Sequence, residues 1–141
     1  MPSTQTAVVA EILVLETSGF LDLILGTPEG QAVRDALVGR QVHVVDNEAV
    51  GIAIALRELR RIGSLSEVAL TRKLGLVADA PFRAHSVREL LVASAARDDL
   101  RLGDALCVEL SHRLAAPLVT TDSRLAAVWS HSWLVTAASN R

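Results

Sequence analysis

Aromatic side chains are scarce in this chain of 141 residues: they make up 3% of it, and tyrosine is absent. Half of the residues are nevertheless apolar, so the predicted core consists of leucine, valine, alanine and isoleucine. The only cysteine, Cys107, excludes an internal disulfide and favours a reducing compartment such as the cytoplasm. We expect Cys107 to be a buried, unreactive thiol on the apolar face of a helix.

Long hydrophobic runs are lacking too. No apolar stretch reaches the roughly 18 residues of a membrane-spanning helix, and the opening MPSTQTAVVAEI has neither the basic start nor the apolar centre of a secretory signal. We therefore expect no membrane association. Because no linker or low-complexity tract divides the chain, residues 1–141 are predicted to form a single domain, with residues 1–7 as a loose leader.

A strong positive charge, the usual mark of a non-specific nucleic-acid binder, is also missing, since the formal net charge is −2. Positive charge is instead local and almost entirely arginine, which supplies 13 of the 14 cations. The planar arginine fork suits phosphate, although such helices are more often simply solvated on that face. The clusters with several cations are Arg57, Arg60 and Arg61; Arg72 and Lys73; and Arg97 and Arg101.

The pattern of apolar residues predicts strands that alternate with helices. Strands are expected over residues 8–15, 42–45, 81–84, 117–121 and 133–136. Helices are expected over residues 20–25, 28–37, 46–62, 66–74, 86–95, 104–114 and 122–128. This alternation predicts an α/β fold with a mostly parallel sheet covered by helices on both faces.

Four acidic residues stand at strand ends or helix starts, where ligands of open α/β sheets collect. Glu16 ends the first strand, Glu48 lies in the first turn of a helix, and Asp104 and Asp122 each open a helix. Taken alone, such an aspartate is more often a helix cap. Four converging carboxylates would repel one another without a cation, and oxygen ligands select Mg²⁺ or Mn²⁺. Such a metal could activate a water to attack a phosphodiester.

Other chemistries find little support. His43, His85, His112 and His131 show no metal-binding spacing, and no histidine–aspartate pair matches Ser18 as a nucleophile. Glycine-rich phosphate loops are absent. Trp129 and Trp133 are predicted to anchor the core or an interface rather than to stack on bases. Asp22 lies in the helix after Glu16, and its direction is left open.

Three segments resemble the motifs of PIN-domain proteins, in the family's order and over roughly residues 12–133. They read VLETSGFLDLILGTPEGQAV, VVDNEAVGIAIALRELRRIG and LRLGDALCVELSHRLAAPLVTTDSRLA. The last segment is the most specific, since it combines an Asp-Ala-Leu helix with a Leu-Val-Thr-Thr-Asp strand end. Within the family, the chain most resembles VapC-type toxins of bacterial type II toxin–antitoxin modules.

This resemblance implies a three-layer α/β/α sandwich, a Mg²⁺ or Mn²⁺ site, endoribonuclease activity, a homodimer and inhibition by a cognate VapB-type antitoxin. The implied catalytic and metal-binding acids are Glu16, Glu48, Asp104 and Asp122, and the residues expected to orient them are Ser18 and Thr121. The arginines expected to contact RNA phosphate are Arg57, Arg60, Arg61, Arg101 and Arg124.

Glu16 departs from the family pattern, in which the first acid is normally aspartate. The longer side chain moves the carboxylate within a site that demands near-octahedral geometry. Glu16 is therefore a substitute ligand, a weaker one, or the sign of a catalytically weakened or inactive PIN-fold protein that acts by binding antitoxin or RNA. A metal-dependent nuclease acting on DNA is a further alternative, because the acidic pocket does not distinguish the sugars.

Overall fold

The structure is a computed structural model, and it describes residues 11–137. Its centre is a five-stranded sheet in the order β3-β2-β1-β4-β5. All four pairs of neighbouring strands are parallel, which confirms the predicted α/β fold. The strands are β1 (Ile12–Leu15), β2 (Gln41–Val45), β3 (Arg83–His85), β4 (Leu118–Thr120) and β5 (Ser132–Leu134).

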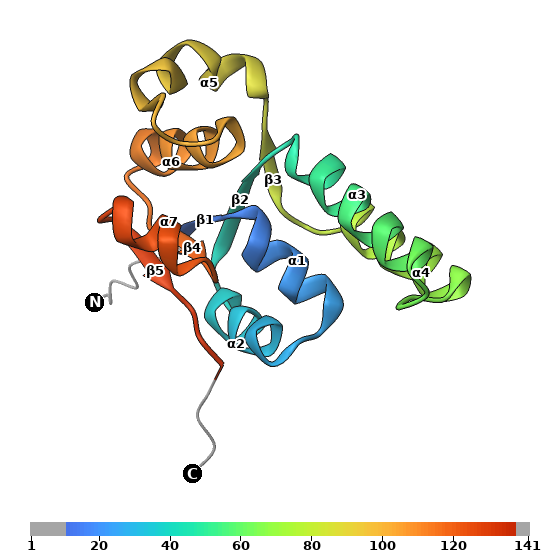
Figure 1. The fold of residues 1–141 in the computed structure, drawn as a ribbon. Coiled ribbons are helices and arrows are strands. Elements are labelled where there is room, and N and C mark those ends of the chain that lie inside the picture. The colour runs from blue at the N-terminus through green and yellow to red at the C-terminus, as the bar shows by residue number, and fades with distance from the viewer. Residues whose placement is uncertain (1–10, 138–141) are drawn as a thin grey trace, which may run out of the picture.

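Helices cover both faces of this sheet and complete a three-layer sandwich (Figure 1). They are α1 (Thr17–Leu25), α2 (Pro28–Leu37), α3 (Glu48–Arg61), α4 (Glu67–Ala78), α5 (Val87–Ser94), α6 (Leu102–Leu114) and α7 (Ser123–Val128), with a short 3₁₀ turn at Ala95–Arg97. Within residues 11–137, no helix combines the length and the hydropathy that crossing a membrane requires.

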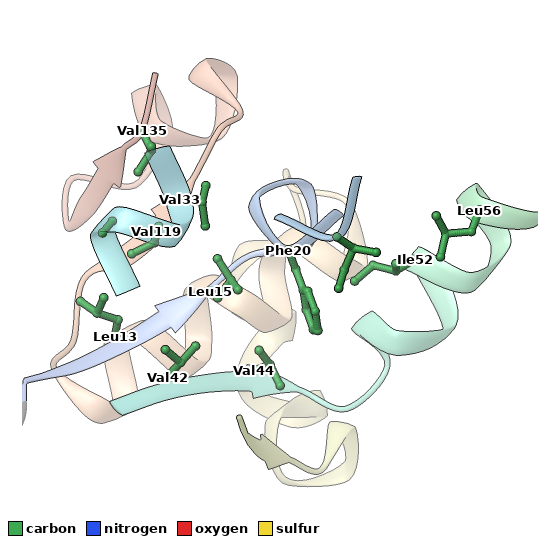
Figure 2. Packing of buried hydrophobic residues seen from close by; sticks show 12 residues of the cluster. Leu13, Leu15, Phe20, Val33, Val42, Val44, Ile52, Leu56, Val119 and Val135 are labelled. Atoms are coloured by element: carbon green, nitrogen blue, oxygen red, sulfur yellow. The ribbon is translucent and has the colours of Figure 1, made fainter. Parts of the chain in front are cut away.

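Two apolar clusters fill the space between the sheet and its helices. Leu13 and Leu15 of β1 pack on one face with Phe20 of α1 and Ile52 of α3, as Figure 2 shows. Val14 of β1 lies in the cluster on the other face, with residues of α5, α6 and α7. The central strand is thus buried on both faces, as its apolar run predicts.

Gly30 allows α2 to lie directly against α1. A Cβ atom at this position would stand 1.9 Å from the carbonyl oxygen of Asp22, so any larger residue would force the two helices apart. Gly63, with a φ of 83°, follows α3 in the left-handed conformation and confirms the helix end predicted there.

Several predicted boundaries are wrong by a few residues. α1 begins at Thr17 rather than Phe20 because Glu16 caps it, with its side chain accepting from the N–H of Ser18. β3 begins at Arg83 rather than Pro81; proline has no N–H for a ladder, and Phe82 packs edge-on against Phe20. β5 lies at Ser132–Leu134 rather than 133–136.

The start of α6 is also corrected. The helix begins at Leu102 and Asp104 lies in its first turn, so Asp104 neither opens nor caps the helix. The predicted leader over residues 1–7 and the predicted strand residues 8–10 lie outside the described residues. Cys107 is a buried free thiol of α6, as predicted.

Candidate active site

The carboxyl ends of three adjacent strands meet at one edge of the sheet. Glu16 follows β1, and its backbone N–H donates to the carbonyl of Val119 in the neighbouring β4. Glu48 begins α3 after β2, and Asp122 follows β4 and caps α7. Asp104 reaches the same edge from the first turn of α6, which packs against β1 and β2. The structure therefore brings the four predicted acids to one region.

Glu16 is 4% exposed and held by three donors. Its Oε2 accepts from the backbone N–H of Ser18 at 2.8 Å, and its Oε1 accepts from the hydroxyls of Ser18 and Thr120. Burial raises the pKa of the Glu16 carboxyl; these hydrogen bonds oppose the rise, and the negative charge of Asp104 adds to it. The carboxylate is thus oriented before any ligand arrives.

Glu48 is the most deeply buried of the four acids, with 2% of its surface exposed. Its Oε2 accepts from the backbone N–H of Val45 at 2.7 Å, and its Oε1 accepts from the hydroxyl of Thr17 at 3.3 Å. Burial holds the pKa of Glu48 well above its ordinary value, despite these hydrogen bonds, and the charge of Glu16 raises it further. Thr17, which turns this carboxylate toward β1, was not predicted from the sequence.

Asp104 and Asp122 line a cavity of about 310 Å³ with Arg101 and Arg124, whereas the buried Glu16 and Glu48 are not among its lining residues. Arg101 Nε stands 3.6 Å from Asp104 Oδ2, and Arg124 Nη2 stands 3.4 Å from Asp122 Oδ2. Burial alone would raise the pKa of Asp122, but hydrogen bonds from the backbone of Arg124 and Leu125 and the Arg124 guanidinium lower it. These contacts favour the charged form of Asp122 at the cavity.

Thr120 connects the buried acids to the cavity. Its hydroxyl donates to Glu16 Oε1 at 2.5 Å and accepts from the backbone N–H of Asp122 at 2.9 Å. This residue was missed from the sequence, although a polar side chain at the end of a fully buried strand is a usable signal. Thr121, the residue predicted to orient the acids, makes no hydrogen bond to any of the four acids within residues 11–137.

Thr121 and Ser18 instead lead to Asp22. The Thr121 hydroxyl donates to Asp22 Oδ2 at 2.8 Å and stands 3.2 Å from Ser18 Oγ. The other carboxylate oxygen of Asp22 accepts from the hydroxyl of Thr27 at 3.2 Å. The direction of Asp22, left open by the sequence, is thus resolved: this carboxylate joins the hydroxyl network that borders the acids.

The five predicted phosphate-binding arginines divide into two groups. Arg101 and Arg124 line the cavity. Arg57, Arg60 and Arg61 lie in the second half of α3, about 13 Å or more along the helix axis from Glu48. Arg60 and Arg61 pair there with the nearby Glu67 and Glu58. The structure thus brings two of the five arginines to the acids.

The four acids offer only oxygen ligands, which suits a hard divalent cation. As the side chains stand, no three acidic, histidine or cysteine groups within residues 11–137 are grouped closely enough to hold an ion. The reason is visible at the mouth, where Asp104 and Asp122 turn toward exposed arginines. Such pairs with exposed arginines contribute little to stability, so breaking them costs little. The donor chemistry therefore fits Mg²⁺ or Mn²⁺.

Known proteins resemble the chain in both sequence and fold, although no family model matches it. Ribonuclease VapC3 of Mycobacterium tuberculosis is 33% identical over 121 residues, which span 84% of this chain and 88% of the relative. Ribonuclease VapC12 of the same species is 31% identical over 129 residues, spanning 86% and 95%.

Two solved structures share the fold at lower identity. PAE2754 from Pyrobaculum aerophilum aligns with a TM-score of 0.67 at 19% identity, over 89% of this chain and 90% of that one. A toxin–antitoxin complex from Klebsiella pneumoniae aligns with a TM-score of 0.58 at 17% identity, over 89% and 98%. With relatives above 30% identity over most of its length, the chain belongs to the VapC family of PIN-domain proteins.

Proposed function

We propose that this protein is a metal-dependent endoribonuclease, the toxin of a VapBC-type toxin–antitoxin system, which hydrolyses RNA phosphodiesters at a Mg²⁺ or Mn²⁺ site. The single observation that carries the proposal is the cavity at the sheet edge. There Asp104 and Asp122 line the cavity beside Arg101 and Arg124, and Thr120 links Asp122 to the buried carboxyl of Glu16. The two relatives named as ribonucleases support RNA as the substrate.

Asp104, Asp122 and Glu16 are the residues that would hold the cation, with Glu48 behind them. When bound, Mg²⁺ or Mn²⁺ would lower the pKa of a coordinated water and stabilise the leaving oxygen. Glu16 keeps its orientation through Ser18 and Thr120. Once their partner acids turn to the cation, Arg101 and Arg124 are free to neutralise the phosphate.

We further propose a cognate VapB-type antitoxin as the partner, a homodimer as the assembly and the cytoplasm as the compartment. The structural neighbour from Klebsiella pneumoniae is a toxin–antitoxin complex, which supports a protein inhibitor. The free thiol of Cys107 is consistent with a reducing compartment.

The alternative, a PIN-fold protein with weakened or lost catalysis, draws on Glu16. Three donors already engage its two oxygens, so a cation competes with Ser18 and Thr120 for the same lone pairs. Such a protein would act by binding antitoxin or RNA. It predicts metal binding without turnover, which separates it from the nuclease.

The test is a cleavage assay on purified chain free of antitoxin, with RNA and with DNA of the same sequence. Mg²⁺ or Mn²⁺ should support cutting of RNA, EDTA should abolish it, and Asp104→Asn should abolish it without unfolding the protein. Asp35→Asn, an exposed acid of α2, is the matched control and should cut normally. Full activity of Asp104→Asn would overturn the site; cutting of DNA alone would favour the DNA nuclease.

A further inference from the structure

The cavity that holds Asp104 and Asp122 is also lined by residues that the proposed hydrolysis does not use. Leu100, Leu125 and Val128 form an apolar wall there, and Asp99 lies on the same lining. Val128, the last residue of α7, is 59% exposed. Together with Leu100 and Leu125, Val128 gives the lining of this charged opening an apolar part that a ligand with an apolar surface could contact.

The charges at the opening restrict the class of ligand. Arg101 and Arg124 have side chains 72% and 75% exposed, so each guanidinium keeps donors free for a phosphate. A ligand that presents a phosphate and a flat apolar surface a few ångströms apart is a nucleotide. In a duplex the base faces are covered by their neighbours, so only an unpaired nucleotide offers a face to the leucine and valine side chains.

Asp99 adds a polar group to this lining that can distinguish one base from another. Its exposed carboxylate accepts hydrogen bonds and donates none. Guanine presents two adjacent donors on its Watson–Crick edge, the ring N1–H and the exocyclic amino group, which match the two oxygens of a carboxylate. Adenine and uracil offer one donor each on that edge, beside acceptors that a carboxylate repels. The neighbouring Asp98 does not line the cavity.

We propose that this cavity is a nucleobase subsite, which takes one unpaired base next to the phosphate held by Arg101 and Arg124 and prefers guanine through Asp99. The volume of about 310 Å³ lies at the lower end of the range of small-ligand sites, roughly 300–1,000 Å³. The inference rests on the proposed function for its choice of RNA as the ligand.

The test measures binding separately from cleavage. A short fluorescent uridine-rich RNA carrying one guanosine is titrated with protein, with Ca²⁺ in place of Mg²⁺, and the probe is checked for breakage afterwards. Probes with adenosine in place of guanosine, and a duplex of the same sequence, complete the set. Cleavage with Mg²⁺ is followed in parallel on the same protein preparations.

Two pairs of variants test the apolar contact made by Val128 and the base preference assigned to Asp99 separately. Val128→Ser should weaken binding of every single-stranded probe by roughly three- to tenfold, the effect of losing apolar contact. Its control is Val92→Ser, a helical valine of α5 that is 89% exposed and should bind as the unmodified protein does. Asp99→Asn should reduce the preference for guanosine over adenosine by about tenfold, whereas Asp98→Asn should leave that preference unchanged.

The outcomes separate this inference from the proposed function. If the protein cuts RNA but Val128→Ser matches Val92→Ser, or Asp99→Asn keeps the full base preference, the subsite is wrong and the nuclease stands. If base-dependent binding responds to both variants while no RNA is cut, the subsite stands and the nuclease proposal fails. Duplex bound as tightly as single strands would also overturn the subsite.

Discussion

The hydroxyl of Thr120 donates a 2.5 Å hydrogen bond to Oε1 of Glu16, although the two residues are 104 positions apart in the sequence. The Thr120 hydroxyl oxygen also accepts from the backbone N–H of Asp122, so one buried side chain sets the position of two candidate metal ligands. Thr120 is fully buried.

Thr120→Val should therefore lower the free energy of unfolding by about 1–3 kcal/mol, because it removes one of the three donors to the buried Glu16 carboxyl and leaves the backbone N–H of Asp122 without a partner. Urea denaturation followed by circular dichroism measures the change. Thr120→Ser keeps the hydroxyl and should lose less, about 1 kcal/mol for the missing methyl group. Equal losses in the two variants would show that the hydrogen bonds contribute nothing.

Glu16→Asp tests whether the longer side chain limits the site. Aspartate is a good helix cap, so α1 should keep its start, while the shorter side chain reaches less far toward Thr120. We expect the rate of RNA cleavage to change by less than about tenfold, because Asp104 and Asp122 still face the cavity. Single-turnover cleavage with Mn²⁺ provides the measurement. A gain well beyond tenfold would show that Glu16 marks a weakened site and would favour the alternative function.

His43 makes stability depend on pH. Its Nδ1 stands 2.7 Å from His85 Nε2, its Nε2 stands 2.8 Å from Gln41 Oε1, and it is 6% exposed. Burial lowers its pKa from the ordinary 6.5, and the positive charges of His85 and Arg83 lower it further. The folded protein therefore binds this proton less well than the unfolded chain does, so stability is full above pH 6.5 and falls as pH drops below it.

His43→Gln should remove this part of the pH dependence. Urea denaturation at about pH 7.5 and about pH 5 should show a larger loss for the unmodified protein than for the variant. Other groups titrate in both proteins, so the quantity to compare is the difference between the two unfolding free energies at each pH. A constant difference would mean that His43 keeps its ordinary pKa in the folded state.

Arg97 holds the 3₁₀ turn against α6 and α7. Its Nε pairs with Glu109 Oε1 at 3.2 Å, and its guanidinium lies 5.0 Å from the centre of the Trp129 ring. Arg97→Met leaves Glu109 nearly buried and unpaired, so it should cost about 2 kcal/mol of unfolding free energy. Adding Glu109→Gln should restore part of that loss. Unfolding free energies are measured by urea denaturation. If the losses of the two single variants simply add in the double variant, Arg97 and Glu109 do not stabilise each other.

The sequence predicted the elements whose signal is local. β1 and β4 are short apolar runs, and each ends at an acid, so both the strands and the placement of Glu16 and Asp122 followed from the pattern. The start of α6 was missed because its cap residue, Arg101, makes no side-chain capping bond. Without a capping signal, Asp104 looked like the first helical residue.

Side-chain contacts between residues far apart in the sequence could not be predicted. Thr120 and Thr121 are adjacent and chemically alike, and only the strand's alternation directs Thr120 to Glu16 and Thr121 to Asp22. Likewise the arginines of α3 carry the same charge as Arg101 and Arg124. Their distance along the helix, not their chemistry, keeps Arg57, Arg60 and Arg61 from the cavity.

The sheet order has a consequence for synthesis. β1 stands at the centre, paired with β2 on one side and with β4 on the other, so Glu16 meets Thr120 and Asp122 only after β4 has been made. A ribosome that has translated α1 to α5 has therefore produced about two thirds of the chain, which still lacks Asp104 and Asp122. For a nuclease of the proposed kind, the nascent chain is unable to cut RNA until β4 has paired with β1.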